Sequence, residues 1–83
     1  MITKDTTLKE LFDSARLSAD TIVQSGEEFR VKDLFRGIEW KRIPKGFRTK
    51  LGSMFFVYVT GGENESFEPL GKTPQNQQIY RKR

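Results

Sequence analysis

The sequence predicts an α+β fold, specifically a small winged helix-turn-helix domain. One observation is the order of the predicted elements, which is helix, short strand, short helix, helix and hairpin. A second is that no internal repeat or long linker divides the chain, so residues 1–83 are expected to form one domain with a modest core. Within it, residues 7–24 form an N-terminal helix and residues 28–83 the winged-helix core and wing. A third is that basic residues gather in segments 36–50 and 72–83.

The helix predicted at residues 7–24 has clear start and stop signals. Thr7 and Glu10 have the spacing of a capping box, in which each side chain accepts from a free backbone N–H of the first turn. Gly26 follows the helix, where a left-handed backbone often ends it. The outward side is acidic and therefore unsuited to nucleic acid. Apolar residues recur at helical spacing on the side expected to face the core: Leu8, Leu11, Phe12, Ala15, Ala19, Ile22 and Val23.

A short strand and a short helix are expected next. Phe29 and Val31 alternate with charged residues, which is typical of a half-buried strand. Residues 32–35 then turn helical, and Gly37 is expected to break that run. The apolar side chains assigned to the core here are Leu34, Phe35 and Ile38.

The second long helix is expected to begin at Pro44 and to stop at Gly61-Gly62. Proline suits a first helical turn because its missing N–H has no intrahelical partner there. The apolar stripe consists of Phe47, Leu51, Met54, Phe55 and Tyr58. The opposite side carries bases and small residues but no acid: Lys45, Arg48, Thr49, Gly52 and Ser53.

The C-terminal residues are predicted to form a β-hairpin that serves as the wing. Segments 66–72 and 78–83 are extended, and residues 73–77 have the composition of a turn. Pro69 lacks a backbone donor, which places the first of these strands at a sheet edge.

The charge distribution suggests a composite basic surface. Segments 36–50 and 72–83 carry net charges of +5 and +4, and the intervening residues 51–71 carry −3. Folding that brings the two basic segments together would create one patch able to contact phosphates. The alternative is two separate solvated faces.

Catalysis, metals and cofactors are not expected. The chain has no Cys and no His, which excludes thiol and imidazole chemistry. Gly71-Lys72-Thr73 resembles the end of a phosphate loop, but Ser66 stands where that loop needs glycine and Pro74 follows it. Glu63, Glu65 and Glu68 lack regular ligand spacing, and their local sequence is typical of a solvated loop.

The basic helix and the hairpin are the candidate nucleic-acid site. Cations meet phosphates, small residues permit close approach, and amides at the turn can hydrogen-bond to the backbone or to base edges. Trp40 is assigned to the core in preference to stacking on a base. The predicted binding residues are Lys41, Arg42, Lys45, Arg48, Thr49, Lys50 and Ser53, followed by Lys72, Gln75, Asn76, Gln77, Tyr80, Arg81, Lys82 and Arg83.

Neither a membrane span nor a secretory leader is predicted. The longest apolar run, residues 54–59, is far shorter than the thickness of a bilayer requires. The N-terminus lacks the apolar segment of a signal peptide. A cytoplasmic location is therefore expected.

The string VKDLFRGIEWKRIPKGFRTKLGSMF, followed by EPLGKTPQNQQIYRK, resembles a family of small bacterial proteins carried by mobile elements. That family is largely of unknown function and includes the small middle protein of staphylococcal cassette chromosome replication operons. The likeness covers roughly residues 28–82. It implies an accessory protein that binds an A-family DNA polymerase and supports primer synthesis, and it supplies no catalytic residues. Its signature consists of Lys32-Asp33-Leu34-Phe35, Trp40, Arg42, Pro44, Leu51-Gly52, Leu70-Gly71-Lys72-Thr73 and Asn76-Gln77-Gln78.

Two functions remain open from the sequence. The first is a non-catalytic module that binds nucleic acid, DNA or RNA, single-stranded or duplex, as an accessory factor in replication or priming of a mobile element. The alternative is an adaptor that docks a DNA polymerase or another replication protein, with Phe56 and Val57 as exposed contacts. A freestanding repressor would need a dimerisation element, for which only the first helix is available.

Overall fold

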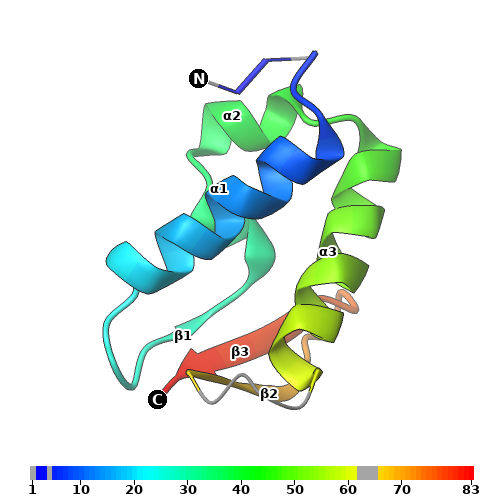
Figure 1. Ribbon diagram of the computed structural model, residues 1–83. Helices are drawn as coiled ribbons and strands as arrows, with labels where there is room; N and C mark the ends of the chain where they lie inside the picture. Colours follow the sequence, from blue (N-terminus) through cyan, green and yellow to red (C-terminus); the bar gives the residue numbers. More distant parts are fainter. Residues whose placement is uncertain (1, 4, 62–65) are drawn as a thin grey trace.

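The computed structural model describes residues 2–3, 5–61 and 66–83. The predicted order of elements is confirmed, and it is that of a winged helix-turn-helix fold (Figure 1). The elements are α1 (Leu8–Thr21), β1 (Glu28–Phe29), a 3₁₀ helix η1 (Val31–Leu34), α2 (Gly37–Arg42), α3 (Lys45–Thr60), β2 (Phe67–Lys72) and β3 (Gln78–Lys82).

The three strands form an antiparallel sheet in the order β1-β3-β2. Phe29 pairs with Tyr80, so these two rings share the face that packs against the helices. A register shift between Pro69 and Gly71 interrupts the pairing of β2 with β3. Among the described residues β2 has β3 as its one neighbour, so the prediction that Pro69 lies on an edge strand is confirmed.

Helix α1 has the predicted capping box but ends earlier than expected. The Glu10 N–H donates to the Thr7 hydroxyl at 3.2 Å, and the Thr7 N–H donates to the Glu10 carboxylate at 3.3 Å. The helix ends at Thr21 instead of residue 24, and Gly26 has the expected left-handed backbone, with a φ of 89°. Ile22 follows the helix and is 70% exposed, so its assignment to the core was wrong.

The core joins both long helices to the sheet. Helix α1 contributes the fully buried Ala15 and Ala19, whose small side chains allow neighbouring elements to approach closely. Helix α3 contributes Leu51, Phe55 and Val59, which recur every four residues. The Phe55 ring lies at the centre of an aromatic cluster, with ring centroids 5.1 Å from Tyr80, 5.7 Å from Tyr58, 6.1 Å from Phe29 and 6.2 Å from Phe67.

The region before α3 differs from the prediction in two respects. The strand β1 ends at Phe29, and Val31, which was assigned to the strand, is the first residue of η1. Gly37 does not end a helix; it is the first residue of α2, and the chain bends at Phe35, which has an extended backbone. This start places Trp40 toward the core, where its ring lies 5.7 Å from that of Phe35. It turns Ile38 outward, 63% exposed, so Ile38 is not a core residue. The assignment of Trp40 to the core is confirmed.

None of the helices in the described ranges is both long enough and apolar enough to cross a membrane.

Candidate nucleic-acid interface

The first turns of α3 present a basic, acid-free surface. Burial of Leu51 on one side of the helix leaves Lys45, Thr49, Lys50 and Ser53 exposed on the other. The Thr49 hydroxyl donates to the Lys45 carbonyl at 3.4 Å, so this side chain stays close to the helix. The short side chains between the lysines leave room for a phosphate backbone to approach.

Two more cations stand at the end of α2, directly before α3. Lys41 and Arg42 are both exposed. One Nη of Arg42 donates to the Ile2 carbonyl at 3.1 Å, which fixes the direction of the guanidinium and leaves its charge unneutralised. The two residues extend the basic surface of α3 across the turn between the helices.

Arg48 has a different environment from its basic neighbours. Its guanidinium carbon lies 5.4 Å from the centroid of the Trp40 ring, and one Nη donates to the Lys41 carbonyl at 3.3 Å. Its Nε is buried and has no hydrogen-bond partner among the described residues. The Arg48 side chain therefore packs α3 against α2.

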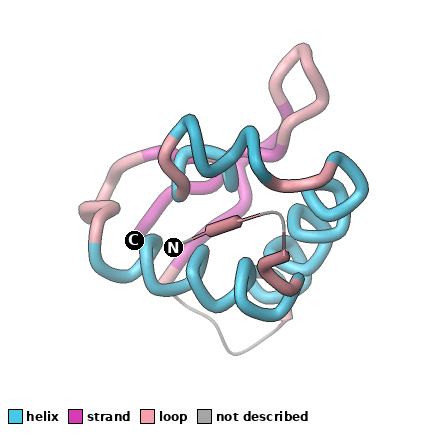
Figure 2. The backbone as a smooth tube through the Cα atoms, turned by 90° about the horizontal axis from the view of Figure 1, so that it is seen from above, coloured by secondary structure: helices cyan, strands magenta, loops and turns pink. Residues whose placement is uncertain are grey.

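The turn of the hairpin extends away from the body of the fold (Figure 2). The Thr73 N–H donates to the Gln77 carbonyl and the Asn76 N–H to the Thr73 carbonyl, each at 2.8 Å. Asn76 has a φ of 66°, the left-handed backbone that asparagine tolerates in tight turns. Gln75 and Asn76 are exposed at the tip, and Lys72 is exposed at the end of β2.

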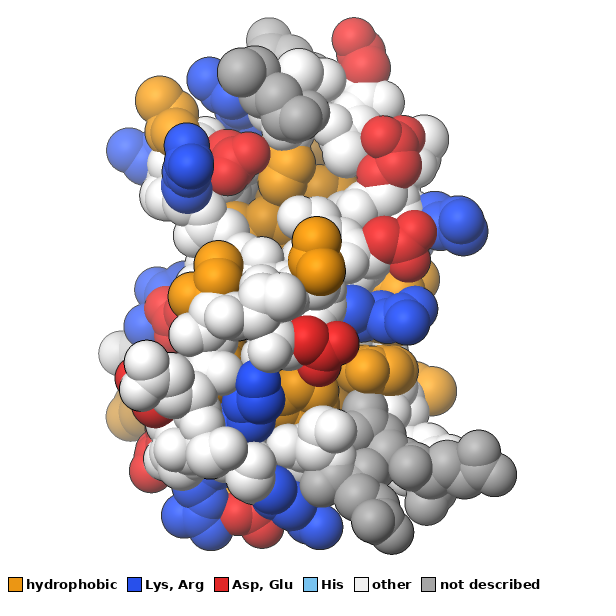
Figure 3. All heavy atoms as spheres, turned by 60° about the vertical axis from the view of Figure 1, so that its left-hand side comes forward, with side chains coloured by type: hydrophobic (Ala, Val, Ile, Leu, Met, Phe, Trp, Pro, Cys, Tyr) orange, Lys and Arg blue, Asp and Glu red, His pale blue; other side chains and the backbone are white. Residues whose placement is uncertain are grey.

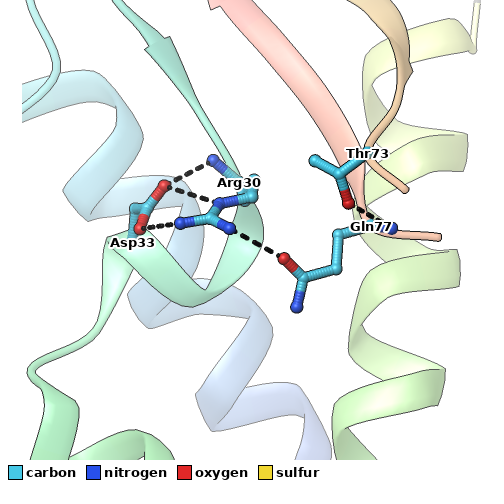
Figure 4. A network of polar contacts seen from close by, with 4 residues as sticks. All are labelled: Arg30, Asp33, Thr73 and Gln77. Carbon is cyan, nitrogen blue, oxygen red and sulfur yellow. Dashed lines mark hydrogen bonds and ion pairs between the residues drawn. The ribbon is translucent and has the colours of Figure 1, made fainter. Parts of the chain in front are cut away.

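Gln77 does not point freely from the tip, because its side chain is held by Arg30 (Figure 4). One Nη of Arg30 donates to the Gln77 side-chain oxygen at 2.9 Å, and Asp33 in turn accepts from Arg30. Arg30 was not among the binding residues predicted from the sequence. Its position directly before η1, three residues from an aspartate, is the only local signal, and that signal indicates a helix start.

The basic residues at the end of β3 have partners within the fold. Arg81 forms an ion pair with Glu68 across the sheet, and Arg83 lies 4.0 Å from the same carboxylate. The Lys82 ammonium donates to the carbonyls of Ala19, Asp20 and Val23, at distances of 3.2, 2.8 and 2.9 Å. These contacts direct the three charges toward protein groups.

Tyr80 was predicted to be a nucleic-acid-binding residue, and its burial contradicts that prediction. Its side chain is fully buried, because pairing with Phe29 places it on the inner face of the sheet. The hydroxyl has no hydrogen-bond partner in the part of the chain that the structure describes. Burial disfavours the charged phenolate and raises the pKa of Tyr80 to about 12.

This burial predicts a loss of stability in alkali. A tyrosine ionises near pH 10 in an unfolded chain, whereas the pKa of Tyr80 in the folded protein is about 12. The contribution of the neutral Tyr80 side chain to the free energy of unfolding is therefore fully present below pH 10 and is lost as the pH rises toward 12. The loss should amount to about 2–3 kcal/mol. Urea unfolding at pH 8 and pH 11.5 measures it.

Tyr80→Phe should remove this component of the alkaline loss. It should also leave stability at neutral pH unchanged or higher, since the buried hydroxyl has no partner among the described residues. Tyr58→Phe, a change at the other tyrosine, should retain the alkaline loss of the parent protein. A Tyr80→Phe variant that loses stability as steeply as the parent would contradict the assignment.

The candidate surface therefore contains five exposed cations: Lys41, Arg42, Lys45, Lys50 and Lys72. No ion pair involves any of them within the described ranges.

Contact between the Phe55 and Phe67 rings packs α3 against β2, so the hairpin lies beside α3 (Figure 1). The side of the molecule on the left of Figure 1 differs, because acidic and basic side chains are interspersed there (Figure 3).

The carboxylate cluster considered in the sequence does not form a described metal site. Glu68 is engaged by Arg81, and Glu63 and Glu65 lie outside the described residues. Over the residues that the structure does describe, no group of three or more acidic side chains is placed to hold a metal ion.

Comparison with known proteins agrees with this fold. The solved structure described as "SCCmec type IV LP1413 - nucleic acids binding protein" has a TM-score of 0.69 and 14% sequence identity, over 90% of this chain and 91% of that one. At this identity the likeness shows a shared fold. No curated protein matches the sequence. Residues 14–82 match the family described as "Domain of unknown function (DUF1413)", which extends the family region into α1, beyond the resemblance seen in the sequence. The chain belongs to the DUF1413 family.

Proposed function

We propose that the protein is a non-catalytic nucleic-acid-binding module that uses α3 and the hairpin wing. The observation that carries this proposal is the set of five exposed cations that have no ion pair with any residue that the structure describes. Four of them lie at the α2–α3 turn and the start of α3. Such unneutralised charges are available to phosphates, and their binding releases counterions from the nucleic acid.

The uncharged residues of the same surface suit this role. Thr49 and Ser53 are short and exposed between the lysines, where a backbone would approach. Gln75 and Asn76 carry donors and acceptors at the tip of the wing. A recognition helix flanked by a wing, as in this fold, presents two adjacent contact regions to one nucleic-acid segment.

The shared fold also supports the proposal. The solved structure with the TM-score of 0.69 is described as a nucleic acids binding protein. Its description also contains the term SCCmec, which agrees with the mobile-element family that the sequence resembles and with an accessory role in replication or priming of such an element. We extend both descriptions to this chain as parts of the proposal.

A second candidate function is an adaptor for a replication protein such as a DNA polymerase. The observation in its favour is the exposure of two large apolar side chains on α3, 42% for Phe56 and 65% for Val57. They lie one turn beyond Ser53, so a protein partner could occupy the end of α3 while nucleic acid occupies its beginning.

The salt dependence of binding tests the primary proposal. We expect mixed-sequence oligonucleotides to bind with a slope of log K against log salt of about −4 for duplex DNA and about −3 for single strands, corresponding to four or five phosphate contacts. Lys50→Ala should weaken binding to all sequences and make the slope shallower by about 1. Fluorescence anisotropy over a range of salt concentrations measures both quantities.

Two control variants sharpen this test. Lys9→Ala removes an exposed lysine of α1 that lies 3.7 Å from Asp13, so affinity and slope should not change. Gln75→Ala should lower affinity at nearly constant slope, because the amide carries no charge. If the oligonucleotides fail to bind at low salt, or if Lys9→Ala and Lys50→Ala have equal effects, the surface is only solvated and the adaptor function takes precedence.

A further inference from the structure

The wing needs a contact with the body of the fold to hold a fixed direction. An isolated two-stranded hairpin is marginally stable in water, and the turn at 73–77 extends away from the helices (Figure 2). Its described backbone hydrogen bonds join Thr73, Asn76 and Gln77 to one another. These bonds set the shape of the turn and do not connect it to η1 or to the helices.

Arg30 makes a side-chain contact that ties the turn to the rest of the fold (Figure 4). Its Nη donates to the Gln77 side-chain oxygen at 2.9 Å, and the two residues are 47 positions apart in sequence. Arg30 lies between β1 and η1, at the edge of the core, and its side chain is 34% exposed. The contact is therefore partly shielded from water, where a charge-assisted hydrogen bond is stronger than at the open surface.

Asp33 holds the guanidinium in the required orientation. One carboxylate oxygen accepts from the Arg30 backbone N–H at 2.9 Å and from its Nε at 3.4 Å, and the other accepts from an Nη at 3.5 Å. The planar guanidinium is thereby oriented from one edge, and the other Nη is directed toward Gln77.

Gln77 transmits this restraint to the whole turn. Its backbone N–H donates to the Thr73 hydroxyl at 3.2 Å, and its carbonyl accepts from the Thr73 N–H at 2.8 Å. Both ends of the turn are therefore fixed through one residue. Gln75 and Asn76 lie between those ends, and Lys72 directly precedes them.

We propose that Arg30 is a positioning residue that fixes the direction of the wing through Gln77 and so preorganises it for nucleic acid. Arg30 acts from inside the fold and makes no contact with phosphate itself. Gln77, which was predicted from the sequence to be a binding residue, acts together with Arg30 as a positioning residue. This inference rests on the proposed function for its binding consequence, whereas its structural consequence holds for the free protein.

The free protein gives the first test, through amide hydrogen exchange of the full chain. Arg30→Lys keeps the charge but loses the planar fork, and Gln77→Ala removes the acceptor while the contact between Arg30 and Asp33 remains. In each variant the Thr73 and Asn76 amides should exchange roughly 3- to 10-fold faster, the factor expected for loss of one hydrogen bond. The Leu11 amide, which donates to the Thr7 carbonyl at the start of α1, serves as an internal reference.

A matched control is Arg16→Lys, which changes another arginine that lies near an aspartate, at 3.8 Å from Asp13 on α1. It should leave exchange in the turn unchanged. If Arg30→Lys fails to fold, Gln77→Ala still decides the question, because it leaves Arg30 and η1 intact. Unchanged exchange of Thr73 and Asn76 in Gln77→Ala would overturn the proposal.

The binding consequence is tested by a double-mutant cycle on mixed-sequence oligonucleotides. Arg30→Lys and Gln77→Ala should each weaken binding roughly 3- to 10-fold with an unchanged salt slope, and the double variant should be no weaker than either single variant. Additive losses would show that Arg30 contacts the nucleic acid directly and would overturn the positioning role. If the parent protein binds no oligonucleotide, the proposed function fails, and the exchange experiment still decides whether Arg30 orders the turn.

Discussion

Phe55→Ala is expected to lower the free energy of unfolding by about 3–5 kcal/mol. The Phe55 side chain is fully buried, and its ring contacts aromatic residues from all three strands, so truncation leaves a cavity between α3 and the sheet. A domain of this size has a total stability of roughly 4–12 kcal/mol. The variant should therefore be largely unfolded in moderate urea concentrations that leave the parent protein folded, as followed by circular dichroism.

The adjacent residue provides the control for this prediction. Phe56→Ala makes the same chemical change one position along α3, where the side chain is 42% exposed. It should cost less than about 1 kcal/mol, because a large part of this side chain is already exposed to solvent and alanine favours the helix. Equal losses in the two variants would mean that the side of α3 facing the sheet has been misassigned. Phe56→Ala also reports on the adaptor function, since it removes an apolar contact from a folded protein.

Lys82→Met is expected to destabilise the protein by about 1.5–3 kcal/mol, the range for hydrogen bonds that involve a charged group. The Lys82 ammonium donates to three carbonyls at the end of α1, which has no basic residue of its own in the last turn. Methionine keeps much of the length of the apolar stem and removes the donor, so the carbonyls lose a partner and the favourable interaction with the helix dipole disappears.

Lys72→Met is the matched substitution, also within the hairpin. Lys72 is exposed and has no ion pair within the described residues. The free energy of unfolding of the Lys72→Met variant should therefore differ from that of the parent protein by less than about 0.5 kcal/mol. The salt slope should show the reverse pattern, becoming shallower by about 1 for Lys72→Met and remaining nearly constant for Lys82→Met. Urea unfolding and anisotropy titrations of the two variants therefore separate a lysine that supports the fold from one available to phosphate. An unchanged unfolding midpoint for Lys82→Met would contradict its role at the end of α1.

The sequence by itself determined the types and order of the elements. Each depends on signals within a few residues: the capping box at Thr7, the proline before α3, the glycine after it and the polar turn at 73–77. Local backbone preference and hydrophobic periodicity act over that same range, which is why the winged-helix order was predictable. The acid-free start of α3 was visible for the same reason, since residues on one helical face recur every three or four positions.

Only the tertiary structure decided which predicted binding residues remain available. Tyr80 became a core residue because the register of β3 pairs it with Phe29, and alternation along a strand does not by itself reveal which face is buried. Lys82 and Arg30 have partners 59–63 and 47 residues away, respectively. A charged side chain shows the same local pattern whether it is solvated, paired with a carboxylate or bonded to a distant carbonyl. Its role is determined when folding brings that distant group within hydrogen-bonding distance.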